Sequence, residues 1–515
     1  MRCCSIAMIS LVCACAHHGA TAGGPTPNAD VQEFAALAWV PDQPTYVWTA
    51  HSVRDAQRSI DDVIDSFGML SGATAADAGH ALEHVLSVDP LSESGTQKLG
   101  VDPAGSIAMF SEGLDPTIVV QLASPDTTHA FFDSVKATNG VATQSVIVDG
   151  IEVSTVKLFG HVRASWAIAK SGEGPTRSTA GGGAKVDDKT WLWAHFAFGV
   201  DRPTPDGEWF AKAHAAHAGA WTKSFAWAKD LRAKLAAKAT GLLGFFDVHA
   251  LLAIARAHAP KDALACLDLV QPIGLAGFAI EGDGRHAGGR LALDLGPAAQ
   301  RIAAAVLPAP AGFERLAQIA PITAQWNLDI GAVASAIAPC WRTIGGDMDF
   351  LTRYGVRTAR VAVMTIDPDK PRDSTGVFAA DLSDATYLRG LLDQIPHRSM
   401  AENDRAYGGI AGHRISIPFI ISLDYILNDR LAMLALGDGL LDKAVTGTPA
   451  PPPLFALDLI VPGLSEGAWK FVIAKATNEW FAKRATALLQ GWHDGHLRVT
   501  IDHDALVLEA SGNRR

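Results

Sequence analysis

The strongest constraint on the fold of this chain is an internal duplication. Short patterns from the first half return in the same order in the second half, at a spacing of about 255 to 265 residues. Leu99–Val101 returns as Tyr354–Val356, and Ile107–Phe110 returns as Val361–Met364. A single match of this length carries little weight, but a constant order and spacing indicate that one structural unit occurs twice.

Later segments extend the match and favour strands. Trp166–Ala169 resembles Leu431–Leu434, and Trp191–Phe198 resembles Leu454–Val461 as a strand that leads into a long helix. In residues 497–501, apolar and polar side chains alternate, which is typical of a strand with one buried face. Strands of this kind, joined by short turns, favour an antiparallel sheet.

The sequence therefore predicts an α+β fold made of two tandem copies of a mostly antiparallel sheet, each with helices packed on one face. The first unit spans residues 34–300 and the second spans residues 313–515, with the proline-rich segment Pro308–Gly312 between them. Within the first unit, helical spacing of apolar residues over Val53–Phe67 predicts an amphipathic helix that turns Asp62 toward solvent.

Composition limits the classes of function. The formal net charge of −11 argues against nucleic acid and against electrostatic binding to anionic lipid, since both need a basic surface. Hydrophobic residues make up 48% of the chain and charged residues 19%, which supplies enough apolar material for a core. We therefore expect a folded protein that does not bind nucleic acid.

The first 15 residues have the pattern of an export signal. Arg2 precedes a short apolar run, Ile6–Val12, which is followed by Ala14 and Cys15. The run is too short to cross a bilayer as a helix, which needs about 20 apolar residues. This segment resembles the signal of bacterial lipoprotein precursors, in which a small residue precedes a cysteine that is released by cleavage and lipidated. The resemblance implies that residues 1–15 form the signal and that Cys15 carries the lipid.

Residues 16–33 are small, polar and rich in Gly and Pro, which predicts a flexible tether. With this signal and its duplication, the chain resembles the large duplicated envelope lipoproteins of uncharacterised function in Gram-negative bacteria. The resemblance implies an exported protein that its N-terminal lipid holds at the membrane. By the same analogy, Ala16 after the lipidated cysteine implies the outer membrane, facing the periplasm.

Two cysteines follow the signal, Cys266 and Cys340. An even number of cysteines in an oxidising compartment favours a disulfide, which would close a loop of about 74 residues. The alternative is two buried free thiols, since free cysteine is often part of an apolar core.

No segment carries a motif that defines an enzyme. The chain has no G-x-S-x-G nucleophile elbow, and Gly181–Lys185 lacks the spacing of a phosphate-binding loop. His214 and His217 are three residues apart with no acidic residue between them, and His493 and His496 have the same weak spacing near Asp494, beside a turn. The first pair lies in an Ala-rich stretch that indicates a helix surface. We therefore predict no catalytic residue, no metal site and no cofactor.

An aromatic stripe is the best sequence candidate for a ligand site. The helix predicted over Gly207–Ala239 carries Trp209, Trp221, Phe225 and Trp227. Either this helix packs across a wide sheet, or these side chains line a groove for an apolar ligand.

These features predict a lipid-anchored envelope protein, not an enzyme, with a binding or scaffolding role toward an unknown protein partner. The alternative is a periplasmic carrier or sensor of an apolar ligand such as lipid, which the aromatic stripe suggests. A hydrolase with a site assembled from scattered residues is the third hypothesis.

Overall fold

The computed structural model describes most of the chain after the predicted tether; the signal, Cys15 and residues 16–33 lie outside the described residues. No helix in the described part is long and apolar enough to cross a membrane. The described residues are 34–71, 77, 79–80, 83, 88–90, 92–139, 142–158, 162–170, 189–198, 206–219, 235, 241–343, 354–367, 370, 373–393, 401–417, 421–448, 451–460 and 491–514.

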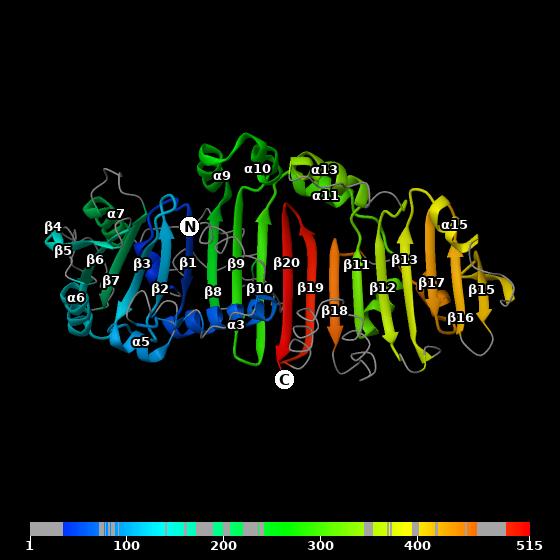
Figure 1. The fold of residues 1–515 in the computed structure, drawn as a ribbon, viewed down its shortest axis with the longest axis horizontal. Coiled ribbons are helices and arrows are strands. Elements are labelled where there is room, and N and C mark those ends of the chain that lie inside the picture. The colour runs from blue at the N-terminus through cyan, green and yellow to red at the C-terminus, as the bar shows by residue number, and fades with distance from the viewer. Residues whose placement is uncertain are drawn as a thin grey trace, which may run out of the picture. The chain divides into compact units, whose positions relative to one another are not determined.

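All 20 described strands belong to one antiparallel sheet (Figure 1), so the prediction of two separate sheets is wrong. The reason is strand β10 (His286–Asp294), which the sequence assigns to the first copy. It pairs along its whole length with β20 (Ala505–Arg514), the last strand of the second copy. This pairing satisfies backbone groups that β20 would otherwise leave open at a sheet edge.

Packing divides the described chain into two compact units. Unit 1 contains residues 34–255 and 275–284, and unit 2 contains residues 256–274 and 285–514. The division falls inside the predicted first copy, because residues 256–274 and strand β10 pack with the second copy.

Unit 1 is built on antiparallel strands in the order β9-β8-β1-β2-β3-β7-β6-β5-β4. The strands are β1 (Tyr46–Ala50), β2 (Ile107–Ser111), β3 (Thr117–Leu122), β4 (Gln144–Val148), β5 (Ile151–Leu158), β6 (Val162–Lys170), β7 (Thr190–Phe198), β8 (Gly241–Asp247) and β9 (Leu275–Gly282). The helices that begin in this unit are η2 (Ala35–Trp39), α3 (Val53–Ser71), α5 (Glu93–Lys98), α6 (Pro125–Asn139), α7 (Asp206–Gly219) and α9 (Val248–His258).

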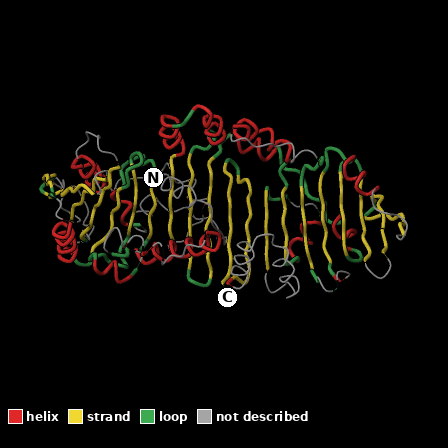
Figure 2. Tube along the Cα trace, in the orientation of Figure 1, coloured by secondary structure: helices red, strands yellow, loops and turns green. Residues whose placement is uncertain are grey.

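Unit 2 is built on antiparallel strands in the order β10-β20-β19-β18-β11-β12-β13-β17-β16-β15-β14. Figure 2 shows the strands in yellow and the helices in red. Its other strands are β11 (Ile322–Trp326), β12 (Ala359–Thr365), β13 (Thr375–Asp381), β14 (Ala401–Tyr407), β15 (Ile410–Ile417), β16 (Ile421–Leu427), β17 (Leu431–Leu436), β18 (Phe455–Ile460) and β19 (Trp492–Asp502). Its helices are η5 (Lys261–Ala263), α10 (Leu264–Val270), α11 (Ala298–Ala304), α12 (Phe313–Ile319), α13 (Ile330–Thr343), α15 (Thr386–Asp393) and α16 (Leu440–Val445).

The strand order of unit 1 recurs in unit 2. Each of the strands β1 to β9 corresponds to the strand whose number is ten higher, β11 to β19. A pair of glycines recurs with it. Gly100 and Gly355 have φ angles of 72° and 67°, and each carbonyl accepts a hydrogen bond from a serine N–H, Ser124 and Ser383 respectively. A Cβ atom at either glycine would collide with backbone, so both positions require glycine.

Two of the sequence matches are wrong at the level of strands. Trp166–Ala169 lies in β6, whereas Leu431–Leu434 lies in β17, which takes the place of β7. Trp191–Phe198 lies in β7, whereas Leu454–Val461 contains β18, the counterpart of β8. These strands are short and apolar, so their side-chain patterns do not distinguish one from the next.

Helices cover both faces of the sheet in unit 1, so the prediction of one covered face is also wrong. Leu192 of β7 packs in a cluster with Val53 of α3, while the next residue, Trp193, meets Phe210 of α7 edge to face. Successive residues of a strand point to opposite faces, so α3 and α7 lie on opposite sides of the sheet. Figure 1 shows α3 crossing β8 and β9.

Asp62 is buried, although the helical pattern assigns it to solvent. It lies on the side of α3 that faces the sheet, against Gly282 of β9, where a Cβ atom would come within 1.9 Å of Asp62 Oδ2. Ser59, one turn earlier in α3, is buried as well. The buried stripe of α3 therefore includes polar side chains, which apolar periodicity alone does not detect.

A buried arginine fixes β12 in unit 2. The side chain of Arg360 is fully buried and donates to Asn327 Oδ1, to Asp381 Oδ2 at 2.8 Å, and to the carbonyl oxygens of Leu307 and Pro308 at 3.1 Å each. A buried charge is tolerated only when it is paired and hydrogen-bonded, and this set of acceptors meets that requirement. The arginine thereby ties residues 307–308 to the sheet.

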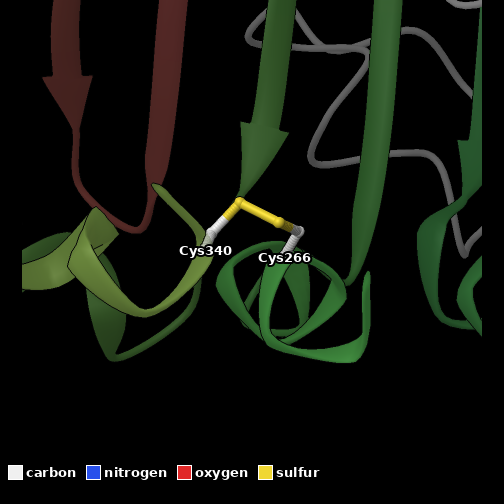
Figure 3. The surroundings of a disulfide bond; sticks show 2 residues. All are labelled: Cys266 and Cys340. Carbon is white, nitrogen blue, oxygen red and sulfur yellow. A yellow bond between two sulfur atoms is a disulfide. The ribbon is translucent and has the colours of Figure 1, made fainter. Parts of the chain in front are cut away.

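Cys266 of α10 and Cys340 of α13 form a disulfide within unit 2 (Figure 3). Their Cα atoms are 4.5 Å apart, and helices α10 and α13 pack against each other around the bond. The sequence left open a disulfide or two free thiols, and the structure contains the disulfide.

Replacing Arg360 should strongly destabilise unit 2. We expect Arg360→Leu to lower the free energy of unfolding by about 3 to 5 kcal/mol, because Asp381 and Asn327 would lose their buried partner. Arg389→Leu is the control, because the Arg389–Asp429 pair is exposed and such pairs contribute at most about 1 kcal/mol. Urea denaturation measures both values, and equal losses for the two variants would contradict the structural role of Arg360.

Removing the disulfide should destabilise the same unit. Replacing Cys266 and Cys340 together by serine should lower the free energy of unfolding by about 4 kcal/mol, since the bond closes a long loop in the unfolded chain. Urea denaturation of the double variant checks this, and the reduced wild-type protein should match it. A midpoint that neither change moves would show that the bond does not constrain the chain.

Candidate functional site

The candidate site is an apolar face of the sheet in unit 2. Leu457, Ala324, Val361, Phe378 and Leu434 lie directly opposite one another on the neighbouring strands β18, β11, β12, β13 and β17. In this row, Leu457 is 40% exposed and Phe378 and Leu434 are each 37% exposed. We use the name apolar surface for this row together with adjoining residues of the same face, namely Ala324, Trp326, Val361, Phe378, Leu434, Phe455, Leu457, Leu497 and Val499.

The opposite face of the same strands is the core of unit 2. There Ala362, Val377 and Met433 are buried beneath helices α12 and α16, which supply Phe313 and Leu441 to the cluster. An antiparallel sheet that packs one face on a core usually presents polar side chains on the other face. Strands β13 and β17 are apolar on both faces, and contiguous exposed apolar patches mark interaction sites.

Unit 1 shows what can bind such a face. Ala50 of β1, Leu242 of β8 and Ile280 of β9 are buried in one cluster with Ala56 of helix α3. Ala50 pairs with Leu242, and Leu242 pairs with Ile280, so the three residues form one cross-strand row under the helix. An amphipathic helix thus fits this part of the sheet.

The corresponding row in unit 2 is part of the apolar surface. Trp326 of β11 pairs with Phe455 of β18, which pairs with Val499 of β19. The rings of Trp326 and Phe455 meet edge to face with centroids 6.3 Å apart. Helix α13 follows β11 as α3 follows β1, yet it packs on α10 through the disulfide. In the described part of unit 2, no helix takes the place that α3 has in unit 1.

The aromatic stripe predicted from the sequence lies only partly within the described residues. Trp209 lies on α7, stacked on His195 of β7 with ring centroids 5.3 Å apart, and Lys212 Nζ lies 4.8 Å above its ring. Trp221, Phe225 and Trp227 lie outside the described residues. Of the predicted groove, the described structure therefore contains one side chain, and it packs on the sheet.

His214 and His217 do not lie on an exposed helix surface, so that prediction is wrong. His214 is buried, with Nδ1 3.3 Å from Asp149 Oδ2, and His217 stacks on Trp39 of η2 with centroids 4.3 Å apart. Burial, and secondarily the charge of His214, lowers the pKa of His217 to about 4. The described residues contain no group of three or more His, Cys, Asp or Glu side chains able to hold a metal ion.

The second histidine pair belongs to a ladder of ion pairs on unit 2. His496 Nδ1 lies 2.9 Å from Asp458 Oδ1, and the hydrogen bond to Asp458 raises the pKa of His496. Burial raises the pKa of Asp458, but hydrogen bonds from His496 and Thr323 outweigh it and hold that pKa below its usual value. His493 pairs with Asp494 at 3.1 Å. The contact between His496 and Asp458 joins neighbouring strands. The two histidines thus have ion-pair partners within the protein, and their three-residue spacing requires no ligand.

Sequence reasoning missed the apolar surface. The signal that could have indicated it is the continuous apolar character of strands such as Leu431–Leu436 and Phe455–Ile460, in a chain whose turns favour antiparallel pairing.

Comparisons with known proteins give little guidance. No protein-family model and no curated protein sequence matches the chain. Among solved structures, it is similar to crystal forms I, III and IV of TP0453, with 10%, 10% and 11% identity and TM-scores of 0.25, 0.26 and 0.25. The matches cover 51–52% of this chain and 79–86% of the other chain. A likeness at this level carries no argument about function.

The histidine cluster predicts a pH dependence of stability. The folded pKa of His217, about 4, lies below its ordinary value of 6.5, so the unfolded chain takes up the proton first as the pH falls. Stability contributed by neutral His217 is therefore complete above pH 6.5 and is lost between 6.5 and about 4, by roughly 3 kcal/mol at most.

Denaturation of a His217→Phe variant across this pH range checks the effect. The phenyl ring keeps the stack on Trp39, and the slope of stability against pH should become shallower. His503→Asn is the control for loss of an exposed imidazole, since asparagine tolerates the positive φ angle of His503, and the change of slope in the His217 variant should exceed that in the control. An unchanged slope in the His217 variant would show that another group governs the pH dependence.

Proposed function

We propose that this chain is a lipid-anchored protein of the bacterial envelope, without enzymatic activity, that binds an amphipathic helix of a protein partner on the apolar surface of unit 2. The observation that carries the proposal is the contrast between the units. The same region of the repeated topology holds helix α3 in unit 1 and is open in the described part of unit 2.

The side chains of the two units indicate what kind of helix fits. Where unit 1 has Ala50 and Leu242, unit 2 has Trp326 and Phe455. The larger side chains of Trp326 and Phe455 extend further from the sheet. A bound helix would therefore need small residues at the contact to approach the sheet closely. The partner helix would carry small and apolar residues at positions i, i+3, i+4 and i+7, the pattern of a helix that binds in a groove or on a face.

The N-terminal residues support the location. Residues 1–15 resemble a lipoprotein signal, and a lipid on Cys15 would hold the protein at the membrane while residues 16–33 leave the folded units free. We place the protein at the outer membrane, facing the periplasm, by the same resemblance.

Site-specific photo-crosslinking tests the proposed binding. A benzophenone amino acid at Leu457 should crosslink, in cells that make the protein, to a second protein through one peptide with an amphipathic helical pattern. Peptide-level mass spectrometry identifies that segment. Replacing Phe378 by Asp should reduce the crosslink at least tenfold, since a charge would be placed in the apolar row.

The same probe at Arg498 is the control. Arg498 is exposed and neighbours Leu497 on β19, so it points to the opposite face of the sheet. The proposal requires no crosslink from this position to the partner segment. Crosslinks from Leu457 only to peptides of this chain would assign the surface to internal packing, and a crosslink to phospholipid would replace the protein partner by an apolar ligand.

A further inference from the structure

Strand β4 is an open edge of the sheet in unit 1. Among the described strands, β4 pairs with β5 alone, through the hairpin closed by Asp149 and Gly150, whose φ angles are 51° and 84°. Two-residue turns with positive φ values close on a hydrogen-bonded pair, here Val148 and Ile151. Because pairs alternate along an antiparallel ladder, Val146 bonds to β5 while Ser145 and Ile147 direct their N–H and C=O groups outward.

Helix α7 packs on one face of β4, with Gly207 next to Val146 and Val148, but the side chains of β4 do not protect its edge. Its sequence, Gln-Ser-Val-Ile-Val, has no charge, and Val146 and Ile147 are 46% and 66% exposed. Natural edge strands usually carry charged residues, prolines or bulges that prevent pairing with another chain. An exposed, neutral, β-branched edge whose outward backbone groups have no strand partner among the described residues is a template for strand addition.

The counterpart in unit 2 has the usual protection. Strand β14 occupies the same place in the strand order and pairs with β15 in the same way. It carries Glu402, Asp404 and Arg405, all exposed. Alignment on the two hairpin turns places Arg405 opposite Val146 and Asp404 opposite Ser145. The two edges share a topology and differ in charge.

We propose that β4 pairs with β4 of a second copy of this chain, antiparallel, about a twofold axis that passes by Val146. In this register Ser145 of each copy exchanges hydrogen bonds with Ile147 of the other copy. The two N–H groups and two C=O groups that each β4 directs outward would therefore all be hydrogen-bonded. The two Val146 side chains meet across the axis, and both strands are neutral, so pairing buries no charge. Because a twofold axis uses the β4 edge of both copies, this pairing stops at a dimer.

The size of the contact sets the strength of the dimer. A strand of five residues buries less surface than the roughly 1,600 Å² of a standard interface, so the free protein should dimerise weakly, at tens to hundreds of micromolar. Tethering to one membrane would raise the effective concentration and favour the pair. The proposed helix-binding surface plays no part in this inference.

A cysteine at the axis tests the register. In the full-length protein with Cys3, Cys4, Cys13 and Cys15 replaced by serine, Val146→Cys should give a disulfide-linked dimer under mild oxidation, seen on a non-reducing gel, because directly opposed residues at such a position lie closest. Arg405→Cys, at the equivalent place on β14, should stay monomeric. Adding Ile147→Lys to Val146→Cys should reduce the linked dimer at least tenfold; since Ile147 is largely exposed, the fold should tolerate lysine.

Sedimentation equilibrium of the wild-type protein gives an independent readout. The weight-average mass should rise from that of one copy toward two with concentration, and Ile147→Lys should abolish the rise. A monomeric Val146→Cys protein, an equal yield from Arg405→Cys, or a wild-type mass that stays at one copy up to several hundred micromolar would each overturn the proposal.

Discussion

The alternation of side chains along antiparallel strands governs this structure. Each strand presents two faces, and strands such as β8 and β17 are apolar on both, so these parts of the sheet need a cover on two sides. Unit 1 meets this need with η2 and α7 on one face and α3 on the other. Unit 2 covers one face with α12 and α16 and one end of the other face with α15, while the disulfide-linked α13 packs on α10. Among the described residues, the apolar surface around Trp326 and Phe455 therefore lacks the helix that covers the equivalent row in unit 1.

The sequence predicted the repeated pattern better than its details. Gly100 and Gly355 were matched correctly because a positive φ angle leaves a strong signature in the sequence. Matches between strands failed, since β6, β7 and β17 have similar apolar patterns and only long-range pairing tells them apart. The single sheet could not be predicted either, because pairing of β10 with β20 depends on edges far apart in the chain.

The candidate site shows the same limit more sharply. An apolar strand has the same sequence pattern whether or not a helix covers it, so the sequence did not indicate that Trp326 and Phe455 are partly exposed. His214 and His217 looked like surface residues because their neighbours are alanines, yet small neighbours are what allow α7 to approach Trp39 and the sheet closely. Burial is a property of the tertiary contact, and local composition did not indicate it.

Duplication gives each unit the same set of surfaces, and the local sequence decides which of them are closed. The edge at β14 is closed by charge and the equivalent edge at β4 is neutral. The face at Ala50 is closed by α3, and the equivalent face at Trp326 is open to solvent in part. In the described part of the chain, unit 1 thus exposes an edge that unit 2 protects, and unit 2 exposes a face that unit 1 protects. A chain with two identical units would expose both kinds of surface twice and would polymerise, whereas complementary protection leaves one surface for each kind of contact.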